Sequence, residues 1–332
     1  MPINALVTGG GGFLGRTIVE QLLARGDRVT VFSRGHYPDV EQAGAKLIQG
    51  DLVDSKSIRE ACAGSDLVFH VAAKAGLWGS WESFYQPNVT GTQYVIDACI
   101  QQGVPKLVYT SSPSVIFDNH PHRGVDESYP YPDTYESFYA HTKAIGEQLV
   151  LEANSPGLLT TTLRPHIIWG PRDTQIIPRL VARAQAGKLV QVGDGSNKVG
   201  MCYVDDAARA HLQAAEALSP DSPVAGSTYF ITHEEPVILW DFVNDLLARL
   251  DVPPVKRQIS LPLARALGGV LEWGFRTFKL DGEPRLTRFL ASELAIDHYY
   301  DIGRAKRDFG FSPQVSIEEG LARTVEYFKK EM

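Results

Sequence analysis

A tyrosine and a lysine four residues apart carry the strongest chemical signal in the sequence. Tyr139 and Lys143 lie in a segment, 137–151, whose pattern predicts a helix, and they project from the same helix face. A carbonyl that receives a hydride needs a proton on its oxygen, and a phenol is a weak acid with a reference pKa of about 10. We expect the Lys143 ammonium group to lower the pKa of Tyr139 and to hold nicotinamide ribose hydroxyls. Chance placement on an exposed helix face is the alternative, and Tyr135 is a competitor without a lysine at i+4.

Two serines follow an apolar run, 107–110, that predicts a buried strand. In an open α/β sheet, the carboxyl ends of the strands face the crevice in which ligands bind. One hydroxyl of the pair Ser111 and Ser112 is therefore expected to hold a substrate oxygen beside Tyr139. Capping of a loop is the alternative interpretation of these serines.

A glycine-rich turn, TGGGGFLG at 8–15, separates a predicted strand, 3–8, from a predicted helix, 13–25. Its G-x-x-G-x-x-G spacing at positions 9, 12 and 15 is typical of dinucleotide binding. Glycine permits the tight turn, the close approach of backbone to a pyrophosphate and the close packing of helix on sheet. The phosphates would then meet the free N–H groups of the helix N-terminus. A flexible loop is the alternative, but the strand–turn–helix context favours a dinucleotide.

The end of the second predicted strand, 29–32, bears on which dinucleotide binds. An NAD site usually carries Asp or Glu there, which accepts from the ribose hydroxyls. This strand instead ends in Ser33 and Arg34, which favour a 2′-phosphate because arginine donates charge-assisted hydrogen bonds. We expect NADP(H) rather than NAD(H), with a solvated loop position for Arg34 as the alternative.

The order of the predicted elements indicates the fold. Apolar runs alternate with amphipathic segments of helical spacing, at 3–8, 29–32, 46–48, 67–73 and 107–110. This rhythm predicts an α/β protein with a Rossmann-type doubly wound parallel sheet and a smaller, mostly helical C-terminal substrate domain. We expect residues 1–170 to form the dinucleotide-binding domain, with a return of the chain to it near 201–232. Residues 171–200 and 233–332 are then expected to form the substrate domain.

Composition excludes several classes of function. The formal net charge is −7 with no basic block, which disfavours nucleic-acid binding. Cys62, Cys99 and Cys202 are far apart and form no C-x-x-C pair, so we expect no disulfide framework, no metal site and a cytoplasmic location. The chain reads directly into the first strand without a signal peptide, and it has no apolar run of about 18 residues that would span a membrane.

Further motifs follow in a fixed order along almost the whole chain, at 50–52, 70–73, 88–92, 109–112, 163–171 and 203–206. With the glycine turn and the Tyr139–Lys143 pair, they make the sequence resemble the extended short-chain dehydrogenase/reductase family. The resemblance assigns the active-site serine to Ser112, with Ser111 as the less favoured choice, and it implies that segment 203–206 is structural. It further implies cofactor contacts from Gly9, Gly12, Phe13, Leu14, Gly15, Ser33, Arg34, Asp51, Leu52, Ala72, Ala73, Lys74, Asn88, Ser111, Tyr139, Lys143, Pro165, His166 and Ile168.

Within that family, the segments 109–112, 299–301 and 306–311 resemble the 3β-hydroxysteroid dehydrogenase-like branch, and 73–79 is similar to bacterial olefin-biosynthesis reductases. This similarity implies NADPH-dependent reduction of 2-alkyl-3-oxoalkanoic acids to 3-hydroxy acids. A homodimer and other enzymes of a hydrocarbon pathway are the partners it implies. A sterol or steroid 3β-hydroxy dehydrogenase and a sugar-nucleotide epimerase or dehydratase are the alternatives. A redox-sensing regulator without turnover is disfavoured, because the chain keeps both Tyr139 and Lys143.

Apolar side chains suggest a small hydrophobic keto or hydroxy substrate. Trp78, Trp81 and Phe84 follow the fourth predicted strand, and segment 261–280 carries an apolar stripe at roughly helical spacing. That stripe has three interpretations: ordinary core, a wall for alkyl chains, or interfacial membrane contact. His166 and Arg172 are candidates for binding a substrate carboxylate, although His166 is the better candidate for a backbone contact to the cofactor.

Overall fold

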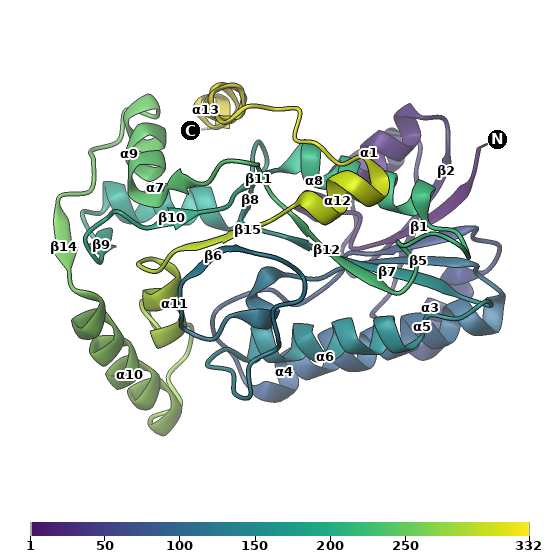
Figure 1. The fold of residues 1–332 in the computed structure, drawn as a ribbon, viewed down its shortest axis with the longest axis horizontal. Coiled ribbons are helices and arrows are strands. Elements are labelled where there is room, and N and C mark those ends of the chain that lie inside the picture. The colour runs from purple at the N-terminus through teal and green to yellow at the C-terminus, as the bar shows by residue number, and fades with distance from the viewer. Residues whose placement is uncertain (1, 332) are drawn as a thin grey trace.

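A seven-stranded parallel sheet forms the centre of the protein (Figure 1). We describe a computed structural model that covers residues 2–331. The strand order is β12-β7-β5-β4-β1-β2-β3, and each neighbouring pair is parallel. The strands are β1 (Asn4–Thr8), β2 (Arg28–Ser33), β3 (Lys46–Gln49), β4 (Leu67–His70), β5 (Lys106–Thr110), β7 (Leu159–Pro165) and β12 (Ser227–Ile231). The predicted Rossmann-type doubly wound sheet is confirmed.

Helices cover both faces of this sheet, which explains why β1, β4 and β5 are mostly apolar and why even the threonines of β7 are buried. One face packs against α1 (Phe13–Ala24) and α8 (Val204–Ala217), and the other against α3 (Ser55–Cys62), α5 (Gly91–Gln102) and α6 (Phe138–Glu152) (Figure 1). Alternate residues of a strand serve opposite faces, so that Val7 belongs to one core and Leu6 to the other.

The fourth strand is shorter than the sequence indicates. It ends at His70 rather than at Ala73. The chain leaves the sheet there because the N–H groups of Ala72 and Lys74 donate to side chains, to Thr8 Oγ1 at 3.2 Å and to Asn88 Oδ1 at 2.7 Å. A short helix, α4 (Trp81–Tyr85), and a π-helical turn, Gln86–Thr90, then lead into α5.

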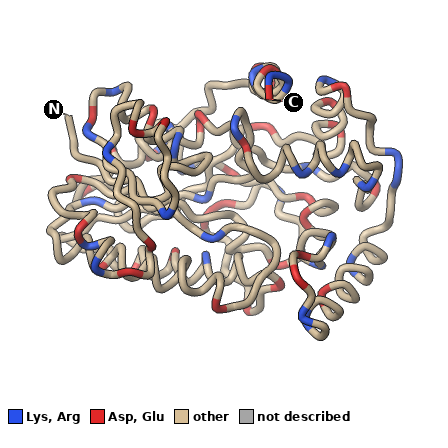
Figure 2. The backbone as a smooth tube through the Cα atoms, turned by 180° about the vertical axis from the view of Figure 1, so that it is seen from behind, with Lys and Arg blue, Asp and Glu red and all other residues tan. Residues whose placement is uncertain are grey.

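The rest of the chain forms a smaller, mostly helical part, as expected, with a four-stranded sheet of order β13-β10-β15-β6. No helix within residues 2–331 has the length and apolar character needed to cross a bilayer. Figure 2 shows basic and acidic positions interspersed along the chain. The remaining elements are β6 (His122–Val125), β8 (Ile168–Trp169), α7 (Ile176–Gln185), β9 (Val190–Val192), β10 (Lys198–Val199), β11 (Cys202–Tyr203), β13 (Val237–Ile238), α9 (Leu239–Arg249), β14 (Arg257–Ile259), α10 (Leu261–Thr277), α11 (Arg288–Glu293), β15 (His298–Tyr300), α12 (Gly303–Phe309) and α13 (Ile317–Glu331), together with a short 3-10 turn at Pro113–Ile116.

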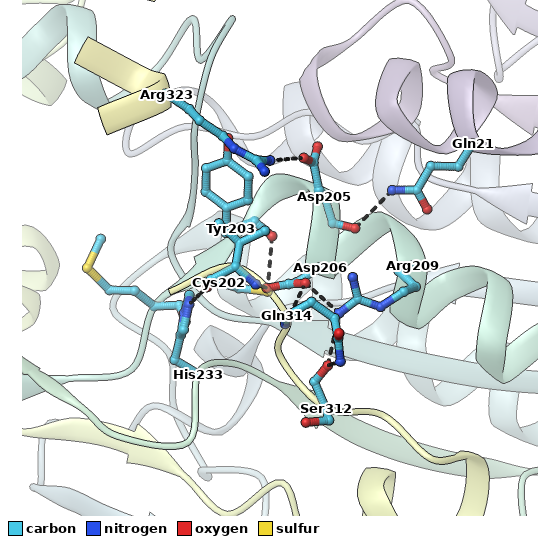
Figure 3. Close-up of polar contacts among 12 residues, drawn as sticks. Gln21, Cys202, Tyr203, Asp205, Asp206, Arg209, His233, Ser312, Gln314 and Arg323 are labelled. Carbon is cyan, nitrogen blue, oxygen red and sulfur yellow. Dashed lines mark hydrogen bonds and ion pairs between the residues drawn. The ribbon is translucent and has the colours of Figure 1, made fainter. Parts of the chain in front are cut away.

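The start of α8 ties the C-terminal segment to the sheet through two adjacent aspartates (Figure 3). The Asp206 carboxylate accepts from the N–H groups of Gln314 at 3.0 Å and Val315 at 3.2 Å, and it pairs with Arg209. The Asp206 side chain is 1% exposed, whereas that of Asp205 is 40% exposed. This arrangement supports a structural role for segment 203–206.

Replacing Asp206 should therefore destabilise the fold strongly. Asp206→Ala leaves the buried Val315 N–H and the part-buried Gln314 N–H without their acceptor and removes the partner of Arg209, and we expect the free energy of unfolding to fall by about 3 kcal/mol. Asp205→Ala, the matched control, removes a half-exposed pair with Arg323 and should cost less than about 1 kcal/mol. Urea unfolding of both variants measures the difference, and equal losses would contradict this account.

Candidate active site

The glycine turn lies where the strand order reverses, between β1 and its neighbours β2 and β4. Gly9 has a φ of +71°, and a Cβ there would lie 2.9 Å from the Ala72 backbone. A Cβ on Gly15 would lie 2.3 Å from the Gly9 carbonyl oxygen. Both positions therefore require glycine. A Cβ on Gly12 would meet only the Gly9 oxygen, at 3.3 Å, so the space in front of α1 is open.

The N-terminus of α1 has the features of a phosphate cradle. Gly12 precedes the helix and gives it no side-chain cap, so the N–H groups of the first turn, which begins with Phe13 and Leu14, keep no side-chain acceptor. An N-terminus of this kind binds phosphate oxygens through its N–H groups and helix dipole. The residues at this turn thus fit the pyrophosphate of a dinucleotide.

The end of β2 offers one free cation. Arg34 is exposed, and among residues 2–331 no carboxylate lies within ion-pair distance of it. Its carbonyl oxygen accepts from Gln49 Nε2 at 2.7 Å, which fixes the backbone there. The Ser33 hydroxyl, in contrast, is buried and has no hydrogen-bond partner. The geometry therefore presents Arg34 to the surface more directly than Ser33.

Buried polar residues hold the chain beyond β4 against β1, and the sequence analysis missed them. Thr92 donates to the Asn88 carbonyl at 2.7 Å, so it accepts from His70 Nε2 at 3.0 Å. His70 Nδ1 then accepts from the Thr8 hydroxyl at 2.8 Å, which itself accepts from the Ala72 N–H. Burial, together with the nearby Lys143 ammonium, lowers the pKa of His70 to about 3. The imidazole is therefore neutral and structural.

Asn88 connects this loop to α6. Its side-chain oxygen accepts from the Lys74 N–H at 2.7 Å, and its nitrogen donates to the Lys74 carbonyl and to Thr142 Oγ1, both at 3.1 Å. The sequence predicts that Asn88 contacts the cofactor, but both ends of its side-chain amide already form hydrogen bonds within the protein. Its geometry is that of a residue that positions loop and helix.

Ser112 and Tyr139 meet at the carboxyl end of β5. Ser112 Oγ accepts from the Ser114 N–H at 3.2 Å and from its hydroxyl at 3.0 Å, so its own O–H remains free to donate. Burial raises the pKa of Tyr139, and a hydrogen bond with Ser112 acts in the opposite direction. Ser111 is buried beside Glu147 instead, where its hydroxyl helps to lower the pKa of that carboxyl. The geometry favours Ser112 over Ser111.

Lys143 lies one helical turn below Tyr139 and is buried. Its ammonium donates to the Thr110 carbonyl at 2.6 Å and sits 4.0 Å from the centre of the Tyr109 ring. Burial lowers the pKa of Lys143 to about 7, and the Glu147 carboxylate opposes this effect. The sequence-based expectation that Lys143 lowers the pKa of Tyr139 is not seen here, because burial dominates the phenol and raises its pKa.

A buried ion pair completes the stripe that Tyr139 and Lys143 begin. Glu147 follows Lys143 by four residues and pairs with Arg164 of β7 through Nε at 3.0 Å and Nη2 at 2.6 Å. The Tyr131 hydroxyl also donates to Glu147, at 2.6 Å. Burial acts to raise the pKa of Glu147. Arg164 and the hydroxyls of Ser111 and Tyr131 outweigh this effect, so the pKa of Glu147 is lowered. The i+4 spacing from Lys143 to Glu147 is visible in the sequence and places both residues on one helix face.

The other predicted cofactor contacts line the same edge of the sheet. Pro165 ends β7, Ile168 begins β8, and Leu52 is buried beyond Asp51 at the end of β3. The His166 N–H donates to the Ile231 carbonyl at 3.1 Å. These placements fit a cofactor that runs along the carboxyl ends of the strands.

The two residues suggested for a substrate carboxylate are engaged elsewhere. Arg172 forms a bidentate pair with Glu20 of α1, at 2.6 and 2.8 Å. His166 Nε2 is 2.6 Å from His298 Nδ1, and burial followed by the nearness of His298 holds the pKa of His166 well below its usual range. Neither residue is free to neutralise a carboxylate, which corrects the sequence-based suggestion.

A small pocket adjoins the N-terminus of α6 and leads to α10. The Phe275 ring of α10 packs edge-on against Trp78, with 6.1 Å between centroids.

The interpretation of segment 261–280 as ordinary core is wrong for most of its apolar side chains. The buried face of α10 is formed by Ala264, Gly268 and Glu272. The side chains that face outward are those of Leu263, Leu267, Val270, Trp273, Phe278 and Leu280.

Comparison with known proteins agrees with this geometry. The model of the 3-beta hydroxysteroid dehydrogenase/isomerase family matches residues 6–263. The chain is 50% identical to a 2-alkyl-3-oxoalkanoate reductase of Stenotrophomonas maltophilia, over 97% of this chain and 98% of that protein. It is 35% identical to a sterol-4-alpha-carboxylate 3-dehydrogenase (decarboxylating) of Mus musculus, over 97% and 90%.

A solved structure supports the fold. The dTDP-glucose 4,6-dehydratase DesIV from Streptomyces venezuelae, solved with NAD and TYD bound, superposes with a TM-score of 0.78 at 24% identity, over 99% of this chain and 97% of that one. The sequence matches carry the argument further, because they run almost end to end at much higher identity. The chain belongs to the 3-beta hydroxysteroid dehydrogenase/isomerase family and is an oxidoreductase.

Proposed function

We propose that this protein is an NADPH-dependent reductase that converts a 2-alkyl-3-oxoalkanoic acid to the 2-alkyl-3-hydroxyalkanoic acid. The observation that carries the reaction class is the hydrogen bond between Ser112 and Tyr139, together with Lys143 one turn further along the same helix, where it donates to the Thr110 carbonyl at the end of β5. The substrate class is supported by the 50% identical relative, which is named a 2-alkyl-3-oxoalkanoate reductase.

The residues divide the work as follows. When bound, the nicotinamide supplies a hydride to the ketone carbon. The O–H of Ser112, which is directed at Tyr139 when no substrate is bound, holds the ketone oxygen, and Tyr139, kept protonated by its raised pKa, donates the proton to that oxygen. Lys143 donates one N–H to the Thr110 carbonyl, and its other N–H groups can donate to the ribose hydroxyls. The first turn of α1 holds the phosphates.

Sterol substrates are the second candidate, favoured by the sterol-4-alpha-carboxylate 3-dehydrogenase relative. The names of the two relatives share one chemical relation. In each, the carboxylate is borne by the carbon next to the one that is oxidised or reduced. We therefore propose a β-keto or β-hydroxy acid as the shared substrate unit.

Several finer statements stay predictions. The family resemblance implies a homodimer through α5 and α6 and other enzymes of a hydrocarbon pathway as partners. The cysteine spacing predicts a cytoplasmic location, and the order of the elements predicts a division into domains at 1–170 with 201–232, and at 171–200 with 233–332. The NADP(H) preference is supported by Arg34, which is exposed and has no carboxylate partner among residues 2–331.

A substrate panel tests the proposed function directly. NADPH oxidation is followed with a freshly prepared 2-alkyl-3-oxoalkanoic acid, a 3-ketosteroid and a nucleotide sugar. We expect the oxo acid to give the highest kcat/KM, because it combines a ketone for Tyr139 with apolar chains that a cleft can bury. No reaction with the oxo acid would overturn the proposal.

Two tyrosine variants locate the proton donor in the same assay. Tyr139→Phe should lower kcat by about 100-fold or more while NADPH binding persists, because the donor is removed without a loss of the cofactor site. Tyr135→Phe is the matched control, since its hydroxyl only donates to the Val115 carbonyl at 3.0 Å. Substantial activity in Tyr139→Phe would mean that another group supplies the proton.

Cofactor preference should depend on Arg34. Arg34→Asp replaces a donor for a 2′-phosphate with an acceptor for ribose hydroxyls, and we expect the ratio of kcat/KM for NADPH over NADH to fall by about 10-fold or more. Arg28→Asp changes the same charge at the opposite end of β2 and serves as the control. An unchanged ratio in Arg34→Asp would show that Arg34 does not read the 2′-phosphate.

A further inference from the structure

The β-keto acid unit raises the question of which residue neutralises the carboxylate. The pocket beside α6 is lined by the loop after β4, the start of α6 and the end of α10, with Leu77, Trp78, Phe84, Phe138 and Arg276 among its walls. Phe138 immediately precedes Tyr139 in α6. The pocket is therefore adjacent to the helix turn that carries the proposed proton donor.

Both acidic side chains of this pocket already have partners. Glu136 forms a bidentate pair with Arg265, at 2.8 and 3.1 Å. Glu272 accepts from the Arg288 backbone N–H at 2.7 Å and from its guanidinium at 3.0 and 3.1 Å. These pairs offset the negative charges that would otherwise repel an anion from the pocket.

Arg276 is the pocket cation without such a partner. Its guanidinium carbon lies 5.2 Å from the Trp78 ring centre and 5.9 Å from that of Phe138. Within residues 2–331, no carboxylate is within ion-pair distance of it. Stacking on aromatic rings uses the face of a guanidinium and leaves the N–H groups at its edge free for a carboxylate.

Lys74 is a second cation near this pocket, because it lies beside Phe84, which lines it. Lys74 Nζ donates to Ser83 Oγ at 2.8 Å and lies 4.7 Å from the centre of the Phe84 ring. No carboxylate of the described chain pairs with Lys74 either. With Glu136 and Glu272 neutralised, Lys74 and Arg276 leave an excess of positive charge at this pocket.

We propose that Arg276 binds the carboxylate of the substrate and so selects β-keto and β-hydroxy acids over neutral ketones and alcohols. This inference rests on the proposed function, since it concerns the acid group of that substrate. Arg276 would bind the carboxylate while Ser112 and Tyr139 hold the neighbouring oxygen. The two contacts would fix which carbon is presented for reaction.

The pocket must widen to admit the substrate. Its free volume is about 10 Å³, close to the space that one water molecule needs. Widening requires a change in the lining side chains, in the loop that carries Trp78 or in α10, which carries Arg276.

The test compares an acid with its methyl ester, which has nearly the same shape and no charge. A 2-alkyl-3-hydroxyalkanoic acid and its ester are oxidised with NADP⁺, because hydroxy acids do not lose carbon dioxide spontaneously. For Arg276→Ala we expect kcat/KM to fall about 10- to 100-fold with the acid and to stay unchanged with the ester. Arg276→Lys should restore part of the activity toward the acid.

Controls separate the possible failures. Arg285→Ala removes an exposed arginine of the neighbouring loop and should leave both substrates unaffected. Arg276→Gln keeps much of the side-chain bulk over Trp78, so it tests for the charge if the alanine variant folds poorly. An equal loss with acid and ester in Arg276→Gln would overturn the role of Arg276 and leave the proposed function standing. No oxidation of either substrate by the unaltered protein would overturn the proposed function itself.

Discussion

A buried ammonium group is the constraint around which this site is built. Lys143 is held out of water, and burial draws its pKa down to about 7, so its charge depends on what surrounds it. The Thr110 carbonyl and the Tyr109 ring contact the ammonium directly. The Glu147 carboxylate opposes the loss of charge, and Arg164 keeps that carboxylate ionised. A lysine in an apolar wall without these groups would be neutral.

The fold brings these groups together from distant parts of the chain. Helix α6 supplies Tyr139, Lys143 and Glu147 as one stripe, whereas Arg164 comes from β7. The parallel order of β4, β5 and β7 puts their carboxyl ends at one edge, where Ser112 follows β5. Asn88 then fixes α6 to the loop after β4 through Thr142 and Lys74. The position of the proton donor thus depends on contacts outside the recognised motif.

Local spacing accounts for what the sequence could predict. The glycine turn and the Tyr139–Lys143 pair are features of short segments, and so is the rhythm of strands and helices. Contacts between distant residues were out of reach: Arg172 is paired with Glu20, 152 residues away, which no local pattern indicates. Periodicity showed that α10 is amphipathic but could not tell which face is buried. Glu272 is buried there because Arg288 pairs with it, and apolar residues remain outside.

The pH dependence of catalysis tests the central role of the Lys143 charge most directly. In the proposed function Lys143 holds the ribose hydroxyls, and the ammonium form has the most N–H donors for them, so we expect kcat/KM to fall as the pH rises through the pKa of Lys143, about 7. In Glu147→Gln the anion that raises this pKa is gone, and the fall should occur at lower pH. Glu127→Gln is the matched control, because Glu127 is a partly buried glutamate that accepts from the Phe230 N–H instead. Identical pH profiles for Glu147→Gln and Glu127→Gln would contradict the account.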